Sequence, residues 1–67
     1  MITLTINGKP RELEGPTKLT AYLESLGVDP KIIAVAHNGT VLRRDEFPGI
    51  TLQAGDEVEI VRPVGGG

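Results

Sequence analysis

Residues 1–27 read MITLTINGKPRELEGPTKLTAYLESLG and contain a predicted hairpin followed by a predicted helix. Apolar residues alternate with threonines over 2–6, and this period of two indicates a half-buried strand. Asn7-Gly8 is the dipeptide that best tolerates the positive φ angles of a tight hairpin turn. The charged segment 10–14 is then the return strand, and its charges are typical of a sheet edge.

Four apolar side chains recur at helical spacing after the hairpin, namely Leu19, Tyr22, Leu23 and Leu26. They fall at i, i+3, i+4 and i+7, which places them on one face of a helix. We expect Thr17 to cap the start of this helix and Gly27 to end it in the left-handed conformation.

The second half of the chain predicts short extended segments separated by turns. Ile32–His37 is the most apolar segment, and its β-branched content favours a central strand. The other predicted elements are a turn at Asn38-Gly39, a strand over 40–42, a loop or 3₁₀ turn over 43–47, an extended piece over 50–52 and a strand over 57–62. In the last strand Val58 and Ile60 share one face and are expected to point to the core.

This order of elements predicts an α+β fold of the ubiquitin-like β-grasp type. A single helix can cover one face of a sheet, and a right-handed crossover brings a later strand parallel to the first. We expect a mixed sheet of four to five strands wrapped around one main helix. In this prediction residues 1–62 form the β-grasp domain and residues 63–67 form a flexible C-terminal glycine tail.

The composition argues against several classes of protein. The chain has 67 residues, a net charge of −2 and no cysteine, so disulfides, thiolate metal sites and a catalytic thiol are excluded. Acidic and basic residues are interspersed, without the basic stripe of a nucleic-acid-binding protein. No apolar run approaches the roughly 20 residues that span a bilayer, and the start does not resemble a signal peptide. We therefore expect a cytoplasmic protein.

No set of side chains in the sequence predicts catalysis or metal binding. His37 follows a predicted strand and is expected to be a surface or half-packed residue. The pairs Asp45-Glu46 and Asp56-Glu57 fall at predicted turns, where carboxylates are usually solvated. We therefore expect no catalytic residue, no metal site and no enzymatic activity of the chain by itself.

The C-terminal glycines are the part of the sequence that could support chemistry. Gly65, Gly66 and Gly67 add no burial, but residues without side chains can thread a narrow channel of a partner protein. Extended, residues 63–67 could reach about 17 Å from the domain. The carboxylate of Gly67 would be unhindered and open to activation by a nucleotide. The ordinary alternative is a frayed terminus or a cloning remnant.

Three segments resemble the ThiS family of ubiquitin-like sulfur carriers. They are INGK at 6–9, NGTVLRRDEF at 38–47 and GDEVEIVRPVGGG at 55–67. The resemblance covers the whole chain, and its most specific part is the ending, where a strand and the apolar Val64 precede the glycines.

This resemblance implies a cycle of sulfur transfer at Gly67. An E1-like adenylating enzyme of the ThiF type would use ATP and Mg²⁺ to adenylate the Gly67 carboxylate. A cysteine desulfurase or sulfurtransferase would supply sulfur to form a thiocarboxylate. A thiazole synthase of the ThiG type would then take that sulfur for thiamin biosynthesis. The chain would be a cosubstrate that binds no cofactor itself, and a monomer is the simple expectation.

The predicted strand faces suggest where such partners would bind. Val61, Ala34 and Ala36 are expected on the open face of the sheet, near Pro63 and Val64. Together they would form a small apolar patch at the base of the tail. The ordinary alternative is a scatter of exposed apolar residues without a partner.

Two other functions share the predicted fold. A MoaD-like or tRNA-thiolation carrier would have the same terminal glycines, although MoaD-like chains are typically longer. The segment 36–60 also resembles TGS-type β-grasp modules, which are regulatory domains attached to larger enzymes. Removing Gly66 and Gly67 would discriminate, because a binding module should keep its ligand and a carrier should lose its function.

Overall fold

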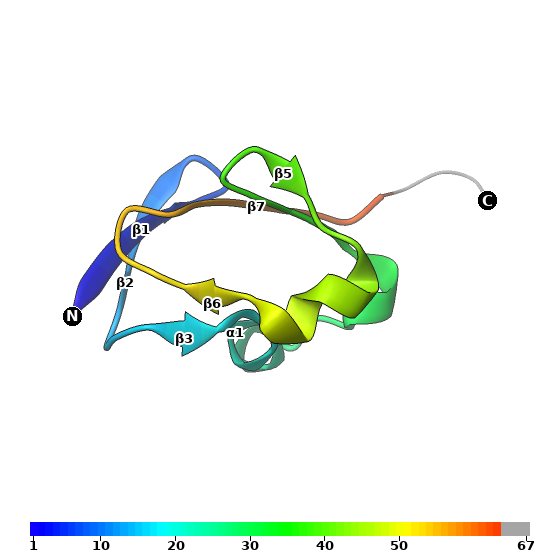
Figure 1. Ribbon diagram of the computed structural model, residues 1–67, viewed down its shortest axis with the longest axis horizontal. Coiled ribbons are helices and arrows are strands. Elements are labelled where there is room, and N and C mark those ends of the chain that lie inside the picture. Colours follow the sequence, from blue (N-terminus) through cyan, green and yellow to red (C-terminus); the bar gives the residue numbers. More distant parts are fainter. Residues whose placement is uncertain (64–67) are drawn as a thin grey trace.

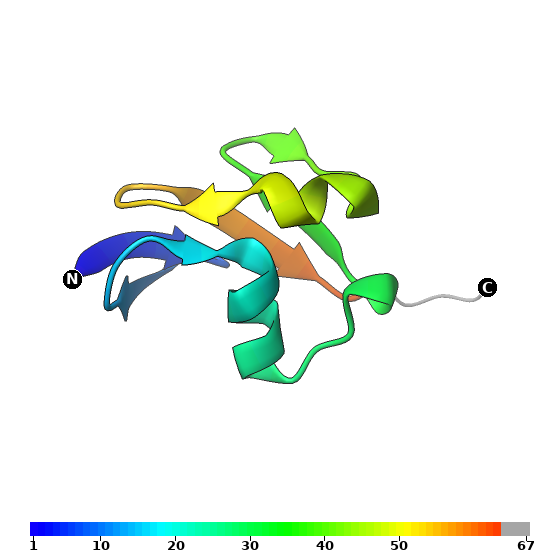
Figure 2. The same ribbon diagram turned by 60° about the horizontal axis from the view of Figure 1, so that its bottom comes forward.

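The computed structural model describes residues 1–63, which form a five-stranded sheet and a layer that covers one of its sides. The elements are β1 (Ile2–Ile6), β2 (Lys9–Leu13), β3 (Thr17–Lys18), α1 (Leu19–Leu26), the 3₁₀ helix η1 (Pro30–Ile32), β4 (Ala34–His37), β5 (Thr40–Val41), the 3₁₀ helix η2 (Arg44–Gly49), β6 (Thr51–Leu52) and β7 (Glu57–Val61). The strand order is β2-β1-β7-β4-β5, and β3 pairs with β6 separately. Figures 1 and 2 show α1, η2 and the β3–β6 pair on the same side of the large sheet. This is the predicted β-grasp arrangement.

Both predicted Asn-Gly turns are present, and both require positive φ angles. Asn7 and Gly8 have φ values of 53° and 79°, and Asn38 and Gly39 have values of 51° and 85°. Asparagine and glycine are the residues that adopt this region at least cost. The turns therefore fix the register of the two hairpins, β1–β2 and β4–β5.

The central strand β7 is held from both sides by these same turns. It runs parallel to β1 and antiparallel to β4, as the crossover rule predicts. Oδ1 of Asn7 accepts a hydrogen bond of 2.8 Å from the Ile60 N–H, and Oδ1 of Asn38 accepts one of 2.8 Å from the Glu57 N–H. Each asparagine thus shapes its own turn and also satisfies a backbone donor of the last strand.

The helix matches its predicted face but not its predicted cap. Leu19 and Leu23 are buried, while Gly27 ends the helix with φ of 73°. The N-cap is Lys18, one residue later than the predicted Thr17. Thr17 pairs in β3, and its hydroxyl donates to the Gly15 carbonyl instead. The Leu19 N–H donates to the carbonyl of Ile50 over 3.0 Å, so tertiary structure replaces a side-chain cap.

The predicted strand Ile32–His37 begins two residues later than expected. Asp29 accepts a hydrogen bond from the Lys31 N–H and Pro30 occupies the first turn, so this segment forms η1 before β4 starts. The buried core joins side chains from both layers, namely Leu4, Ile6, Leu19, Leu23, Val35, Phe47, Leu52 and Val58. Phe47 joins this core from η2.

The bond from Asn7 to β7 can be tested with two substitutions. Asn7→Gly keeps the positive φ angle but removes the acceptor, so we expect the free energy of unfolding to fall by about 1 kcal/mol. Hydrogen exchange at the Ile60 amide should accelerate more than exchange at the Val58 amide. Asn7→Asp retains the acceptor and is the matched control. Equal exchange at Ile60 in both variants would contradict this role of Asn7.

Candidate functional site

The predicted carrier terminus lies beyond the residues that the structure describes. Gly65, Gly66 and Gly67, together with Val64, fall outside residues 1–63, so their predicted roles remain predictions. What the structure places is the base of the tail. Strand β7 ends at Val61, and Arg62 and Pro63 follow as exposed residues. The surfaces that border Pro63 are therefore the described surfaces nearest to the predicted terminus.

The open face of the sheet carries three of the residues of the predicted apolar patch, namely Ala34, Ala36 and Val61, whereas Val64 lies outside the described residues. Val61 pairs directly with Ala34, and Ala36 pairs with Val41 on the other side of β4. Cross-strand partners share a face, so these four residues form one continuous surface, which we call the outer surface. Val61 is 52% exposed and Val41 is 72% exposed, values high for large apolar side chains. Ala34 and Ala36 are half-buried.

Val41 is the member of the outer surface that sequence reasoning missed. The sequence places it in a short strand after a turn, but only the register Ala36↔Val41 shows which face it joins. Beside it, a shallow hollow of about 270 Å³ is lined by Ala36, Gly39, Glu57 and Glu59. The outer surface is therefore apolar with an acidic margin, a combination that suits a protein partner better than an anion.

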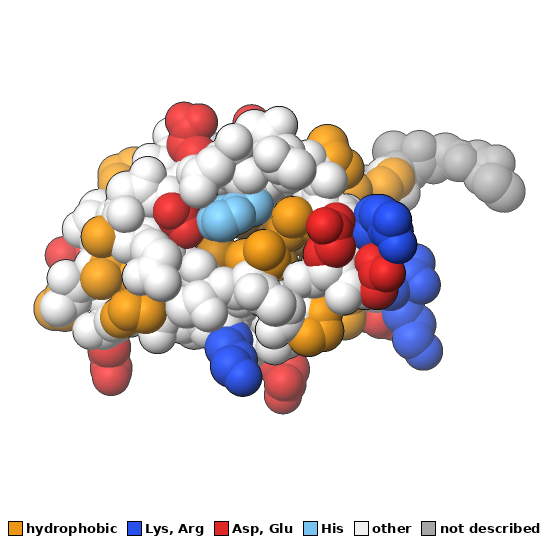
Figure 3. Space-filling view, viewed as in Figure 1, with side chains coloured by type: hydrophobic (Ala, Val, Ile, Leu, Met, Phe, Trp, Pro, Cys, Tyr) orange, Lys and Arg blue, Asp and Glu red, His pale blue; other side chains and the backbone are white. Residues whose placement is uncertain are grey.

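Basic residues gather at the end of the molecule where β7 finishes. The guanidinium of Arg44 donates to the Lys31 carbonyl over 3.3 Å, which brings η2 against η1. Arg43 precedes η2, and Arg62 follows the pair Val61↔Ala34 at the start of β4. Figure 3 shows blue side chains concentrated at this end of the molecule. Acidic side chains lie among them, since Arg43 pairs with Asp45 over 2.9 Å and Figure 3 shows red side chains beside the blue ones.

His37, Asn38 and Asp56 form a polar clasp between the β4–β5 turn and the β6–β7 turn. Nε2 of His37 donates to Oδ2 of Asp56 over 2.8 Å, and Nδ2 of Asn38 donates to Oδ1 over 3.3 Å. The Gln53 N–H also donates to Oδ2, over 2.9 Å. The side chains of His37 and Asp56 are only 20% and 13% exposed. The half-packed position of His37 is confirmed, whereas the predicted solvation of Asp56 is wrong.

The environment of Asp56 favours its charged form. Partial burial raises the pKa of this carboxyl, but the hydrogen bonds from His37, the Gln53 amide and Asn38 outweigh that effect. Its pKa therefore lies below the ordinary value of 3.8. His37 ends β4, Asn38 belongs to the β4–β5 turn and Gln53 to the β6–β7 turn, so the carboxylate has a structural role in joining these two ends. Within residues 1–63, no nucleophilic side chain is arranged beside the Asp56 carboxylate in a way that would indicate catalysis.

The described part of the chain has neither a cluster of metal ligands nor a membrane-spanning helix. Residues 1–63 contain no group of three or more His, Cys, Asp or Glu side chains that could hold a metal ion. They also contain no helix long and apolar enough to cross a membrane.

The chain is similar to proteins of sulfur transfer and thiazole formation. The model of the ThiS family matches residues 4–67. The sulfur carrier protein ThiS of Thermus thermophilus is 44% identical over 62 residues, which cover 92% of this chain and 95% of that protein. A crystal structure of the thiamine biosynthesis protein ThiS from Geobacter metallireducens superposes with a TM-score of 0.86 at 38% identity, covering 98% of this chain and 100% of that one.

A longer relative is similar over only part of its length. A thiazole synthase of Magnetococcus marinus is 37% identical over 62 residues, which cover 92% of this chain. The same match covers 19% of that synthase, so this chain spans about a fifth of its length.

The clasp predicts a specific dependence of stability on pH. At neutral pH, Asp56→Asn should lower the free energy of unfolding by about 1 to 3 kcal/mol, because hydrogen bonds to a charged acceptor are lost. The folded-state pKa is depressed, so the carboxylate stabilises the fold above its unfolded-state pKa. That contribution is lost as the pH falls through the folded-state pKa. Urea unfolding from neutral to acid pH measures both effects.

The wild type and Asp56→Asn should therefore differ less in their free energy of unfolding once the pH falls below about 4. Asp45→Asn is the matched control, because Asp45 pairs with Arg43 over 2.9 Å in an exposed ion pair. Exposed pairs contribute about 0 to 1 kcal/mol, so this control should change little. A difference for Asp56→Asn that is constant at all pH values would contradict the clasp.

Proposed function

The chain belongs to the ThiS family, and from this membership we propose that it is a sulfur carrier protein of thiamin biosynthesis. The observation that carries the proposal is the family match over residues 4–67, which includes β7, the outer surface and all three glycines of the tail. The same match favours thiazole synthesis over the molybdopterin, tRNA-thiolation and TGS-type interpretations of the sequence.

The proposed working group is the carboxylate of Gly67. A carboxylate oxygen attacks the α-phosphorus of ATP, bound with Mg²⁺ by an E1-like adenylating enzyme, and pyrophosphate leaves. A sulfur nucleophile at the oxidation state of sulfide then attacks the carbonyl carbon of the acyl-adenylate. The new C–S bond forms as the C–O bond to AMP breaks, which leaves a thiocarboxylate. The chain acts here as a cosubstrate, and every catalytic group belongs to its partners.

Glycine suits this role for a steric reason. The acyl carbon of Gly67 carries no branched neighbour, so both nucleophilic attacks are unhindered. Gly65 and Gly66 add no side chains that a partner channel would have to accommodate. The proposal therefore assigns Gly67 to the chemistry and Gly65 and Gly66 to passage through the channel.

The outer surface is the proposed docking site for the partners that handle the tail. Ala34, Ala36 and Val61 offer apolar contact beside Pro63, and Val41 extends this contact across β4. We assign to this surface an adenylating enzyme of the ThiF type and a thiazole synthase of the ThiG type. The proposed sulfur source is a cysteine desulfurase or sulfurtransferase, and a thiol reductant supplies the two electrons that bring its persulfide sulfur to the level of sulfide.

The similarity to a much longer thiazole synthase supports a functional link between this kind of chain and that enzyme. The use of ATP and of these enzymes makes the cytoplasm the proposed compartment. A monomer is the proposed form of the free carrier, since its outer surface is needed by each partner in turn.

The chemical proposal is tested by intact mass. The purified chain is incubated with a ThiF-type adenylating enzyme, ATP, Mg²⁺ and sodium sulfide. We expect the mass increase that corresponds to replacement of one oxygen by sulfur, because the adenylate is displaced by sulfide. Deletion of Gly67 should abolish the increase. An unchanged mass, obtained with an enzyme that is active on another carrier, would contradict the proposal.

The docking proposal is tested by a charge placed in the outer surface. Val61→Glu should weaken binding to the adenylating enzyme and to the thiazole synthase by about tenfold or more, since it buries a carboxylate in an apolar contact. Thr3→Glu is the matched control, because Thr3 lies on the same side of the sheet in β1 but outside the outer surface. Isothermal titration calorimetry measures both. Equal affinities for the two variants would contradict this assignment.

A further inference from the structure

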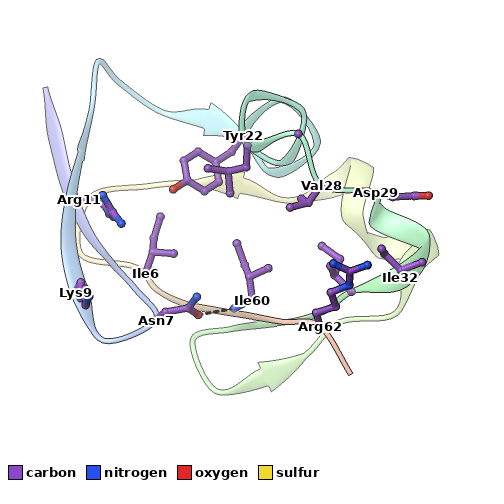
Figure 4. Close-up of a pocket in the computed structure, with 13 residues that line it drawn as sticks. Ile6, Asn7, Lys9, Arg11, Tyr22, Val28, Asp29, Ile32, Ile60 and Arg62 are labelled. Atoms are coloured by element: carbon purple, nitrogen blue, oxygen red, sulfur yellow. Dashed lines mark hydrogen bonds between the residues drawn. The ribbon is translucent and has the colours of Figure 1, made fainter. Parts of the chain in front are cut away.

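The opposite side of the sheet carries a groove. This groove, of about 600 Å³, opens between α1 and the inner faces of β1, β2 and β7. Figure 4 shows Ile6 and Ile60 side by side within it, with Tyr22 and Val28 facing them from the helical side. The groove is separate from the outer surface, because residues that alternate along β7 point to opposite faces.

The interior of the groove is apolar and incompletely covered. Ile6 is buried and Ile60 is half-buried, so these side chains form a firm floor. Leu26 and Ile32, which also line the groove, are 49% and 45% exposed. These are two of the five large hydrophobic residues that the structure exposes within residues 1–63, and Val41 and Val61 of the outer surface are two others. The groove thus presents apolar area that the described part of the chain does not bury.

The charge at the rim is opposite to that of the whole protein. Lys9, Arg11 and Arg62 line the groove, and Asp29 is the acidic residue among its lining side chains. Three of the seven basic residues and one of the nine acidic residues of the chain therefore lie here. The lining has a formal charge of 3 − 1 = +2, while the chain has a net charge of −2. This reversal favours an occupant that carries carboxylates.

The positions of the cations indicate an elongated occupant. Figure 4 shows Lys9 and Arg11 at one end of the groove and Arg62 at the other, with the apolar floor between them. A compact anion would contact one end only. Addition of a strand to β2 is also disfavoured, because Pro10 removes a backbone donor from that edge strand. Side chains of an elongated segment, rather than its backbone, would make the contacts.

We propose that this groove binds an acidic amphipathic segment of a partner protein. Leucine, isoleucine or phenylalanine side chains of the segment pack on Ile6 and Ile60, and its carboxylates pair with Arg11 at one end and Arg62 at the other. The inference goes beyond the sulfur-transfer chemistry and does not depend on it. Because the groove and the outer surface lie on opposite faces of the sheet, a protein held in the groove leaves the outer surface free.

The test is selection from a random 16-residue peptide library displayed on phage, with the full chain as the target. We expect selected peptides to be rich in Asp and Glu flanking Leu, Ile or Phe. Synthetic copies should shift the amide resonances of residues that line the groove, and not those of the outer surface. The double variant K9E/R11E should weaken their binding by about tenfold or more. Repeating the selection on K9E/R11E should enrich Lys and Arg instead.

One control variant and one further test variant separate groove binding from general charge effects. Lys18→Glu makes the same kind of charge change at an exposed residue in β3 that does not line the groove, and it should change affinity less than about twofold. Leu26→Ser should weaken binding because it removes apolar contact with the peptide. Leu26 is exposed, so α1 should remain folded, which circular dichroism measures. Selection of no peptide, of peptides without excess acid, or of peptides that bind the outer surface would overturn the proposal. So would occupation of the groove by a second copy, seen as concentration-dependent shifts of its amide resonances.

Discussion

The parallel pairing of β1 with β7 is the constraint on which the rest of the structure depends. It places the last strand in the middle of the sheet, between the two hairpins. The pairing is short, with the register Thr5↔Glu57 and Ile6↔Val58. The Asn7 side chain extends it, because its Oδ1 accepts a hydrogen bond from the Ile60 N–H. Asn38 does the same for Glu57 on the other side. The position from which the tail leaves the domain is therefore fixed by two turns distant in sequence.

The turns, the helical face and the end of the helix could be predicted because each depends on residues that are close together in the sequence. The Asn-Gly pairs specify positive φ angles, the spacing from Leu19 to Leu26 specifies a helical face, and Gly27 specifies its end. The outward direction of Ala34, Ala36 and Val61 followed from alternation along their strands. The helix cap was predicted wrongly because its true partner, the Ile50 carbonyl, comes from a segment far along the chain.

The features that were missed depend on tertiary neighbours. The sequence predicts a solvated turn at Asp56, yet its donors include His37, which is 19 residues away in sequence. Val41 joins the outer surface only through its register with Ala36. The groove requires the helix to leave part of the inner sheet face uncovered, and spacing along the chain does not report that geometry. The role of Gly67 rests on the family resemblance and stays a prediction, because this residue lies outside the described part of the chain.

The two proposed recognition surfaces and the proposed reaction at Gly67 describe a protein that is passed between enzymes, and the most direct test follows the sulfur itself. The chain is converted to its thiocarboxylate with sulfide enriched in a heavy sulfur isotope, purified, and mixed with a thiazole synthase and its other substrates. The account predicts that the heavy isotope enters the thiazole product and that the chain returns to its unmodified mass. Product without the isotope, or isotope that stays on the chain while product forms, would contradict the account.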